Sequence, residues 1–481
     1  MGDKNKDFNY GYQPLDEFAQ EGDGSGVHDK LTESYELENI DKNKSNDGLG
    51  ALEEKPASET NANGLGVMTA AIFIVGEICG AGAISFPAAL SKTGIYGLFL
   101  IVVVVFACVY AGLLLGHSWK RIDEQRQNKD PLRDPYPYMG EVAVGRKFRH
   151  FITVTLNVQL FLTCVVYLLL AAEIVGSFVS FHVGHIHQQG NLRLWLIILA
   201  CIITPLTWLG TPKDFWFVAV AAAGSTTLAL LLVWIKYGMI APEDLGAVEK
   251  APVTLGSFAS AFGTFVFGFT GASLFPTIQS DMRNPGEFSK AAYLGYLGIF
   301  LLYVPTALGG YFVLGKDIRS SILRTLSHYD KVHHSSRSIV SIAECLFAAH
   351  FVTGFVLMLN PCLQQLGEFF KVPHKFCFQR VALRSLAMLA ILVSCEIFPQ
   401  FGPIVDLVGG SINVLLCFVF PITIYLKLFP ETTTKSKLVM AAIIIFAVLG
   451  GTASTVSNAW NISKEFHKLY FAKGATGHPE V

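Results

Sequence analysis

The chain has 481 residues, of which 52% are hydrophobic and only 15% carry charge, and its formal net charge is −1. This composition is too apolar for a soluble enzyme, and the chain holds no nucleophile elbow, metal-ligand motif or phosphate-binding loop. We therefore expect neither an enzyme nor a metal site, and no cofactor or nucleic-acid partner.

The N-terminal segment, residues 1–66, is polar: it contains 15 acidic and 6 basic residues and few large apolar ones. Such a segment cannot bury enough apolar surface to offset the entropy lost on ordering. We interpret it as a disordered acidic tail on the cytoplasmic side. Within it, Tyr12 to Leu15 reads YQPL, which has the form of a tyrosine-based sorting signal that an adaptor could bind.

Apolar runs follow this tail, each long enough to cross a bilayer as a helix, for which about 20 residues are needed. We predict eleven spans, at 67–90, 94–117, 151–181, 193–211, 215–240, 256–279, 290–314, 338–370, 380–398, 403–427 and 436–458. The sequence thus predicts an all-α integral membrane protein with a transmembrane domain at 67–458 and a short extracellular or luminal tail at 459–481.

Basic residues gather in the loop between the second and third spans, among them Lys120, Arg121, Arg146, Lys147 and Arg149. Positive charge is enriched in cytoplasmic loops, so we place the N-terminus in the cytoplasm. No cleavable signal peptide is visible, because apolar sequence begins only after the long polar segment. The resident membrane stays open between the plasma membrane and an endolysosomal or vesicular membrane.

The first span contains the run Val75 to Pro87, VGEICGAGAISFP, with glycines at Gly76, Gly80 and Gly82. Glycine is a poor helix former and proline removes a backbone donor, so we expect this helix to unwind near its middle. Unwound backbone is tolerated at membrane depth only where it is buried in protein or lines a watery cavity. The interruption therefore indicates a binding site.

The sixth span repeats part of this pattern. Gly271 to Pro276, GASLFP, matches Gly82 to Pro87, GAISFP, at four of six positions. Two interrupted spans at corresponding places in two halves are typical of secondary transporters built from inverted repeats. The alternative is that these glycines only let helices pack closely.

The third span carries the polar residues Asn157, Gln159, Tyr167 and Glu173. Polar side chains within spans usually face the bundle interior, so we expect one face of this helix to line the core. In the fifth span, Gly224 to Thr227 supplies small residues suited to close packing or to offering oxygens to a cation.

Several short runs together carry a resemblance to a known family. They are Gly80 to Pro87, Phe275 to Pro285, Asn360-Pro361, and Leu407 to Gly410 followed by Pro421. Across residues 67–458 the chain resembles the amino acid/auxin permease family of secondary transporters. The resemblance implies a LeuT-like fold of two inverted five-helix repeats plus an eleventh helix, with helices 1 and 6 discontinuous, and amino acid transport coupled to an ion.

One departure from the family concerns the first interruption. Where many relatives have Asn just before it, this chain has Gly76, with Glu77 next to it. A carboxylate at membrane depth is expensive and is by default a functional hypothesis.

An amino acid zwitterion needs a partner for each of its charges. We expect its carboxylate to bind the freed backbone N–H groups of Gly80, Ala81 and Gly82, at the positive end of a half-helix.

The second interruption would supply the other partner. Carbonyl groups released around Phe267, Gly268, Thr270 and Gly271 would bind the ammonium group. Phe267, Phe269 and Tyr167 would wall the side-chain pocket, although ordinary aromatic packing between helices is an equal alternative for each of them.

For ion coupling, Glu77 is our first candidate as a proton carrier, because a carboxyl group in a low-dielectric setting takes up a proton more readily than one in water. Alternatively, Glu77 pairs with a buried cation or caps the interruption. His350 and Glu173 are further candidates. A sodium site between spans 1 and 8 would need hydroxyl and carbonyl oxygens, and span 8 offers only Thr353 near its middle, which disfavours sodium.

The sequence therefore predicts a secondary active transporter of small or neutral amino acids that works by alternating access and is coupled to protons. Two alternatives stay open: a sodium-coupled symporter, and an amino acid sensor that uses the same pocket and signals through the acidic tail.

Overall fold

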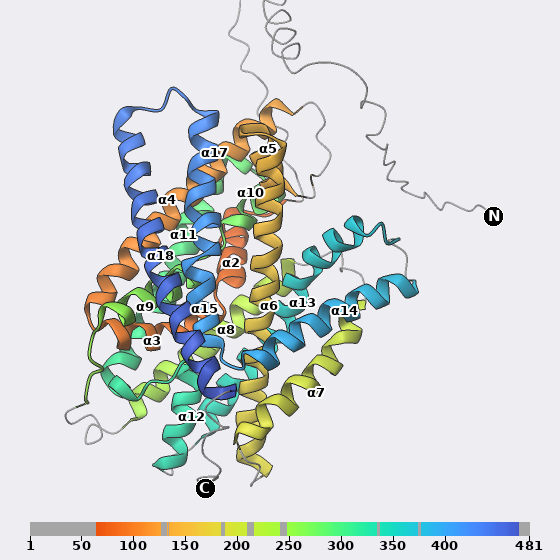
Figure 1. The fold of residues 1–481 in the computed structure, drawn as a ribbon. Coiled ribbons are helices and arrows are strands. Elements are labelled where there is room, and N and C mark those ends of the chain that lie inside the picture. The colour runs from red at the N-terminus through yellow and green to blue at the C-terminus, as the bar shows by residue number, and fades with distance from the viewer. Residues whose placement is uncertain are drawn as a thin grey trace, which may run out of the picture. The chain divides into compact units, whose positions relative to one another are not determined.

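The computed structural model describes residues 64–126, 132, 134–183, 188–208, 216–240, 248–333, 337–373 and 377–470. The predicted signal at Tyr12 to Leu15, the acidic tail up to residue 63 and residues 471–481 lie outside this part of the chain. The described residues form helices joined by short connections (Figure 1).

The helices follow one another along the chain from red to blue in Figure 1. They are α2 (Val67–Ile78), α3 (Ala81–Thr93), α4 (Tyr96–Gln125), α5 (Pro135–Ala143), α6 (Arg146–Val183), α7 (Gln188–Trp208), α8 (Trp216–Met239), α9 (Leu255–Gly268), η3 (Ala272–Leu274), α10 (Phe275–Asp281), η4 (Pro285–Glu287), α11 (Phe288–Leu314), η5 (Gly315–Asp317), α12 (Ile322–Val332), α13 (Ser338–Phe369), α14 (Phe378–Ile397), α15 (Phe401–Gly410), α16 (Ile412–Val414), the π-helical turn η6 (Leu415–Val419), α17 (Phe420–Leu428) and α18 (Thr434–Tyr470).

Eight of the described helices are long and apolar enough to cross a membrane, and α2 with α3 makes a ninth if this pair, bent by 61°, is one span. The predicted spans 193–211 and 380–398 fall on α7 and α14, which are not among these nine. The all-α membrane architecture therefore holds, whereas the count of eleven spans stays a prediction.

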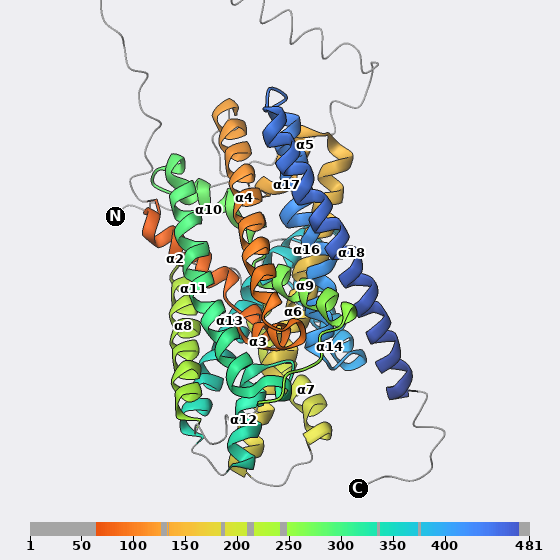
Figure 2. The ribbon, with the colours of Figure 1, turned by 90° about the vertical axis from the view of Figure 1, so that its left-hand side faces the viewer.

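The two interrupted regions of the sequence lie side by side in the fold. Helix α3 packs against α9 and α11, and α2 packs against α8 and α11 (Figure 2). An aromatic cluster joins α3, α9 and α11: the ring of Phe86 lies 5.1 Å from Phe265, 5.4 Å from Phe269 and 4.6 Å from Tyr303, centroid to centroid. Edge-on contacts of this kind stabilise aromatic packing beyond the area that it buries.

Glycines bring α9 and α15 into backbone contact. A Cβ atom added to Gly263 would lie 2.0 Å from the carbonyl oxygen of Asp406, and one added to Gly409 would lie 1.8 Å from the carbonyl oxygen of Gly263. Small residues at helix interfaces in membranes permit such close approach. The contact fixes the residues that follow α15 next to the end of α9.

A buried ion pair holds the amphipathic helix α12 to α8. The ammonium group of Lys236 on α8 pairs with the carboxylate of Asp330 on α12, and both side chains are almost wholly excluded from solvent. Breaking a buried pair by removing one partner leaves an uncompensated charge and costs about 3–5 kcal/mol.

We therefore expect Lys236→Met to lower the thermal unfolding temperature of the detergent-solubilised protein, because Asp330 would lose its buried counter-charge. The double variant Lys236→Met/Asp330→Leu should recover most of the loss, since replacing a buried pair by apolar groups is often neutral. Lys290→Met is the control: Lys290 pairs with Glu287 in a solvent-exposed position and should change stability little. An unfolding temperature of Lys236→Met equal to that of the control would contradict a structural role for the pair.

Candidate functional site

The first helix is interrupted where the glycine run predicts it. Helix α2 ends at Ile78 and α3 begins at Ala81, with Cys79 and Gly80 between them. A Cβ atom on Gly80 would lie 2.8 Å from the Tyr167 hydroxyl and 3.0 Å from His350 Nε2. Glycine is needed here because side chains from α6 and α13 approach the backbone directly.

The carbonyl groups freed at this interruption have side-chain partners. Tyr303 on α11 donates its hydroxyl proton to the carbonyl of Ile78 at 3.1 Å, and Thr226 on α8 donates to that of Cys79 at 3.4 Å. On the other side, the N–H groups of Ala81 and Gly82 belong to the first turn of α3, where a helix supplies no acceptor of its own. The N–H groups of Ala81 and Gly82 are therefore available as donors at this interruption.

The sixth predicted span is also irregular. Helix α9 ends at Gly268, the short turn η3 begins at Ala272, and α10 starts at Phe275. The Phe267 carbonyl, which we expected to be released, accepts from the N–H of Thr270 at 3.2 Å.

Other carbonyls at this second interruption are used differently. The carbonyl of Phe269 accepts from the Tyr296 hydroxyl at 3.3 Å. The carbonyls of Gly268 and Thr270 accept no hydrogen bond from the part of the chain that the structure describes. These two are therefore the acceptors that a bound cationic group could use.

The two interruptions touch one another through their glycines. A Cβ atom on Gly82 would lie 2.6 Å from the Cα of Gly268, and one on Gly271 would lie 2.3 Å from the Cγ1 of Ile78. Each interruption therefore has a glycine that faces the backbone or side chain of the other, so any larger residue would push the two apart.

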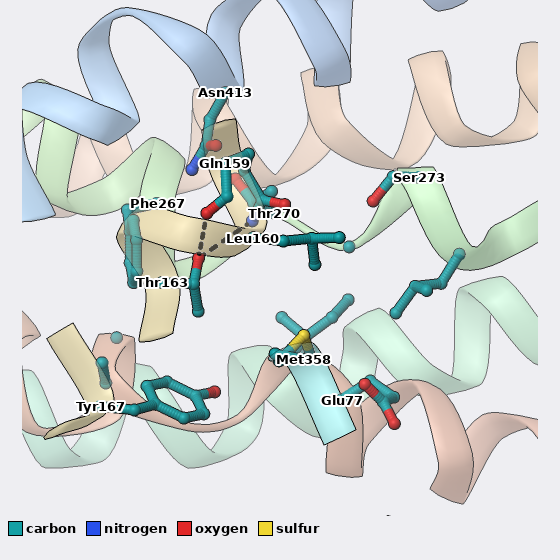
Figure 3. A pocket seen from close by; sticks show the side chains of 15 residues that line it. Glu77, Gln159, Leu160, Thr163, Tyr167, Phe267, Thr270, Ser273, Met358 and Asn413 are labelled. Atoms are coloured by element: carbon teal, nitrogen blue, oxygen red, sulfur yellow. Dashed lines mark hydrogen bonds between the residues drawn. The ribbon is translucent and has the colours of Figure 1, made fainter. Parts of the chain in front are cut away.

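A cavity of about 60 Å³ lies between these segments (Figure 3). It is lined by Glu77, Ile78, Ala81, Gly82, Gln159, Leu160, Thr163, Tyr167, Phe267, Thr270, Gly271, Ser273, Leu274, Met358 and Asn413. The lining thus combines both interruptions with α6, α13 and α16.

Seven of the residues predicted for the site line the cavity: Glu77, Ala81, Gly82, Tyr167, Phe267, Thr270 and Gly271. Gly80 and Gly268 contact lining residues, and Gly76 is buried one turn earlier in α2. Phe269 is not part of the lining: it is fully buried against Phe86 and Tyr303.

The sequence analysis missed several lining residues, above all Thr163, Ser273, Met358 and Asn413. Thr163 lies four residues after Gln159 and four before Tyr167, so the helical period of polar residues on the third span could have found it. No comparable signal marks Asn413, a single amide in an apolar run.

Glu77 is one of the residues that line the cavity, and it is labelled in Figure 3. Its side chain is half-buried, and no hydrogen bond or ion pair joins its carboxylate to another described residue. A carboxylate in this position is available to a proton or to a cationic ligand.

His350 lies on α13 next to Gly80 of the first interruption, and it is only 3% exposed. Its Nδ1 lies 3.1 Å from the hydroxyl of Thr226, whereas its Nε2 has no partner among the described residues. Because Nε2 faces Gly80, protonation of this ring would place a charge directly beside the unwound backbone.

The two remaining candidates for ion coupling lie elsewhere. The carboxylate of Glu173 lies 3.4 Å from the Arg324 guanidinium on α12, so it already has a partner. Thr353 is exposed, and its hydroxyl donates to the carbonyls of Ala349 and His350 in its own helix. Neither residue faces the cavity, and Thr353 offers no oxygen to a sodium ion between α2 and α13.

A sequence model of the family described as transmembrane amino acid transporter protein matches residues 63–462. The chain belongs to this family. The match confirms the resemblance to the amino acid/auxin permeases and makes the chain a multi-pass membrane protein.

Two plant proteins that are named amino acid transporters share about a quarter of the aligned residues with this chain. The chain is 26% identical over 402 residues to amino acid transporter AVT1B of Arabidopsis thaliana, which covers 82% of this chain and 70% of that protein. It is 23% identical over 422 residues to AVT1C of the same plant, covering 86% and 72%.

Among solved structures, that of MhsT in complex with L-phenylalanine matches with a TM-score of 0.55 and 14% identity, covering 82% of this chain and 99% of MhsT. This structural similarity supports the LeuT-like fold predicted for this chain.

We expect Gly82→Val to abolish substrate uptake. Its Cβ would meet the Cα of Gly268 at 2.6 Å, and overpacking of this kind costs about 1–3 kcal/mol and separates the two interruptions. The measurement is uptake together with membrane insertion, which should stay intact. Gly224→Ala on α8 is the control, since a Cβ there meets no atom within 4 Å. Normal uptake by Gly82→Val would contradict a substrate site at the contact between Gly82 and Gly268.

Proposed function

We propose that this protein is a secondary active transporter that moves small or neutral amino acids by alternating access and is coupled to protons. The observation that carries the proposal is the contact between the two interruptions, Gly82 against Gly268, beside a cavity lined by residues of both. Interrupted helices that meet in this way are the usual substrate site of transporters with inverted repeats.

The site has groups that match both charges of a zwitterion. The N–H groups of Gly80, Ala81 and Gly82 lie at the positive end of α3 and suit a carboxylate. The carbonyls of Gly268 and Thr270, together with Glu77, suit an ammonium group. Relatives that are named amino acid transporters, and an MhsT structure that holds L-phenylalanine, support this substrate class.

The size of the cavity favours small substrates. By the same measure of volume a single water needs about 10–15 Å³, so a cavity of about 60 Å³ holds the equivalent of a few waters. That space suits an amino acid with a short side chain better than an aromatic one in this conformation.

Glu77 is the first candidate for the coupling proton, because it lines the cavity without a partner among the described residues. A carboxylate that is neutral when substrate leaves and ionised when it binds would tie proton movement to transport. His350, with Nε2 beside Gly80, is the second candidate.

The proposal is tested with purified protein in proteoliposomes that are offered a panel of labelled amino acids under a proton gradient, a sodium gradient or neither. We expect accumulation of a small neutral amino acid under the proton gradient alone. Accumulation that requires a sodium gradient would show that the coupling ion is sodium and not the proton. Saturable binding without any flux would favour a sensor.

The role of Glu77 generates a separate prediction. Glu77→Gln keeps the size of the side chain but cannot ionise, so we expect the pH dependence of transport to flatten while substrate exchange continues. Glu287→Gln, at an exposed loop carboxylate, should keep the wild-type pH profile. An unchanged profile in Glu77→Gln and a flattened one in His350→Gln would transfer the coupling role to His350.

A further inference from the structure

The side chain of Asn413 is completely buried, and neither its Oδ1 nor its Nδ2 has a hydrogen-bond partner among the described residues. It lies in α16 and lines the cavity, and Figure 3 shows its amide pointing from α16 towards Phe267 and Gln159. Buried polar groups in folded proteins are nearly always paired, so each exception asks for an explanation.

Three polar side chains that line the cavity with Asn413, those of Gln159, Thr163 and Thr270, already form hydrogen bonds. The amide of Gln159 donates from Nε2 to the Thr163 hydroxyl at 3.2 Å, and that hydroxyl donates to the carbonyl of Gln159 at 2.9 Å. The hydroxyl of Thr270 donates to the carbonyl of Val266 at 2.7 Å. Asn413 differs from them because both its donor and its acceptor remain available.

The backbone around Asn413 is irregular and firmly held. Helix α15 ends at Gly410, Ser411 breaks the helical path, and the π-helical turn η6 begins at Leu415. Turns of this kind occur frequently at functional sites. The contact of Gly409 with Gly263 anchors the preceding helix, α15, to α9.

We propose that the amide of Asn413 forms hydrogen bonds with the side chain of the substrate. The transported amino acids are then small and carry a neutral hydrogen-bonding group such as a hydroxyl. This inference rests on the proposed function, because it assigns part of the same cavity. A substrate hydroxyl can donate to Oδ1 and accept from Nδ2, which pairs both atoms at once.

The same geometry discriminates against apolar analogues. A methyl group in place of the hydroxyl would leave both polar atoms of Asn413 buried and unpaired, and sites of this construction reject such analogues strongly. The carboxylate of Glu77 in the same cavity disfavours acidic side chains by like-charge repulsion.

The test compares isosteric substrates in proteoliposomes. Wild-type protein should take up threonine in preference to valine and serine in preference to alanine. In Asn413→Leu we expect the threonine-to-valine ratio of uptake efficiency to fall at least about tenfold, because leucine accepts the methyl group and cannot pair with the hydroxyl.

Two further variants keep the test decisive. Asn413→Thr supplies a hydroxyl, which can also donate and accept a hydrogen bond, and should recover part of the preference. Asn157→Leu removes an amide on α6 that is bonded to the carbonyl of Thr153 and lies outside the cavity lining, so it should keep the wild-type ratio. The unfolding temperature of each variant with added threonine or valine reports binding independently of transport.

The outcomes separate this inference from the proposed function. If no amino acid is carried or bound by the wild type, the transporter assignment fails. If the wild type carries amino acids but Asn413→Leu keeps the threonine-to-valine ratio, the role of Asn413 is overturned. An equal loss of uptake for all substrates would also overturn it, because Asn413 would then hold a group that every amino acid shares.

Discussion

The structure depends on how backbone polar groups find partners where a membrane helix is interrupted. Hydrocarbon offers no substitute for a lost helical hydrogen bond, so the freed carbonyls of Ile78, Cys79 and Phe269 must be paired from within the protein. Hydroxyls of Tyr303, Thr226 and Tyr296 supply those pairs. Neighbouring helices α8 and α11 thereby stabilise the interruptions and leave the first-turn amides of α3 for a ligand.

Close glycine contacts add a second constraint. Gly82 meets Gly268, and Gly263 meets Gly409, at distances that exclude any Cβ atom. The first contact joins the two interruptions, and the second brings the segment after α15 to the same place. Three chain segments that are far apart in sequence therefore meet beside one small cavity.

Much of this arrangement could be predicted, because glycine, proline and an internal duplication act locally. The run from Gly76 to Pro87 locates the first interruption, and the repeat at Gly271 locates its counterpart. The rotation of each helix about its axis was not predictable in the same way. Thr353 faces outwards and Phe269 packs behind the cavity. The sequence pattern nevertheless made both of them candidates for the site, like the residues that do line the cavity.

Asn413 escaped prediction for a different reason. A single amide in an apolar span is ordinarily paired by its neighbours, and only the three-dimensional structure shows that Asn413 has no such partner among the described residues.

Some buried polar groups of the described chain are paired and others are not. Away from the cavity, Glu344 is paired with Arg337 at 3.1 Å, and Asp406 accepts from Ser260 at 2.6 Å. Beside the interruptions, the amide of Asn413 and Nε2 of His350 have no partner within the described chain. Burying a polar group without a hydrogen bond is unfavourable, so an apolar residue of similar size at position 413 should make the fold more stable. Because Asn413 lines the cavity and Nε2 of His350 faces Gly80, their unpaired atoms fit the roles proposed for them as contacts for a ligand or a proton.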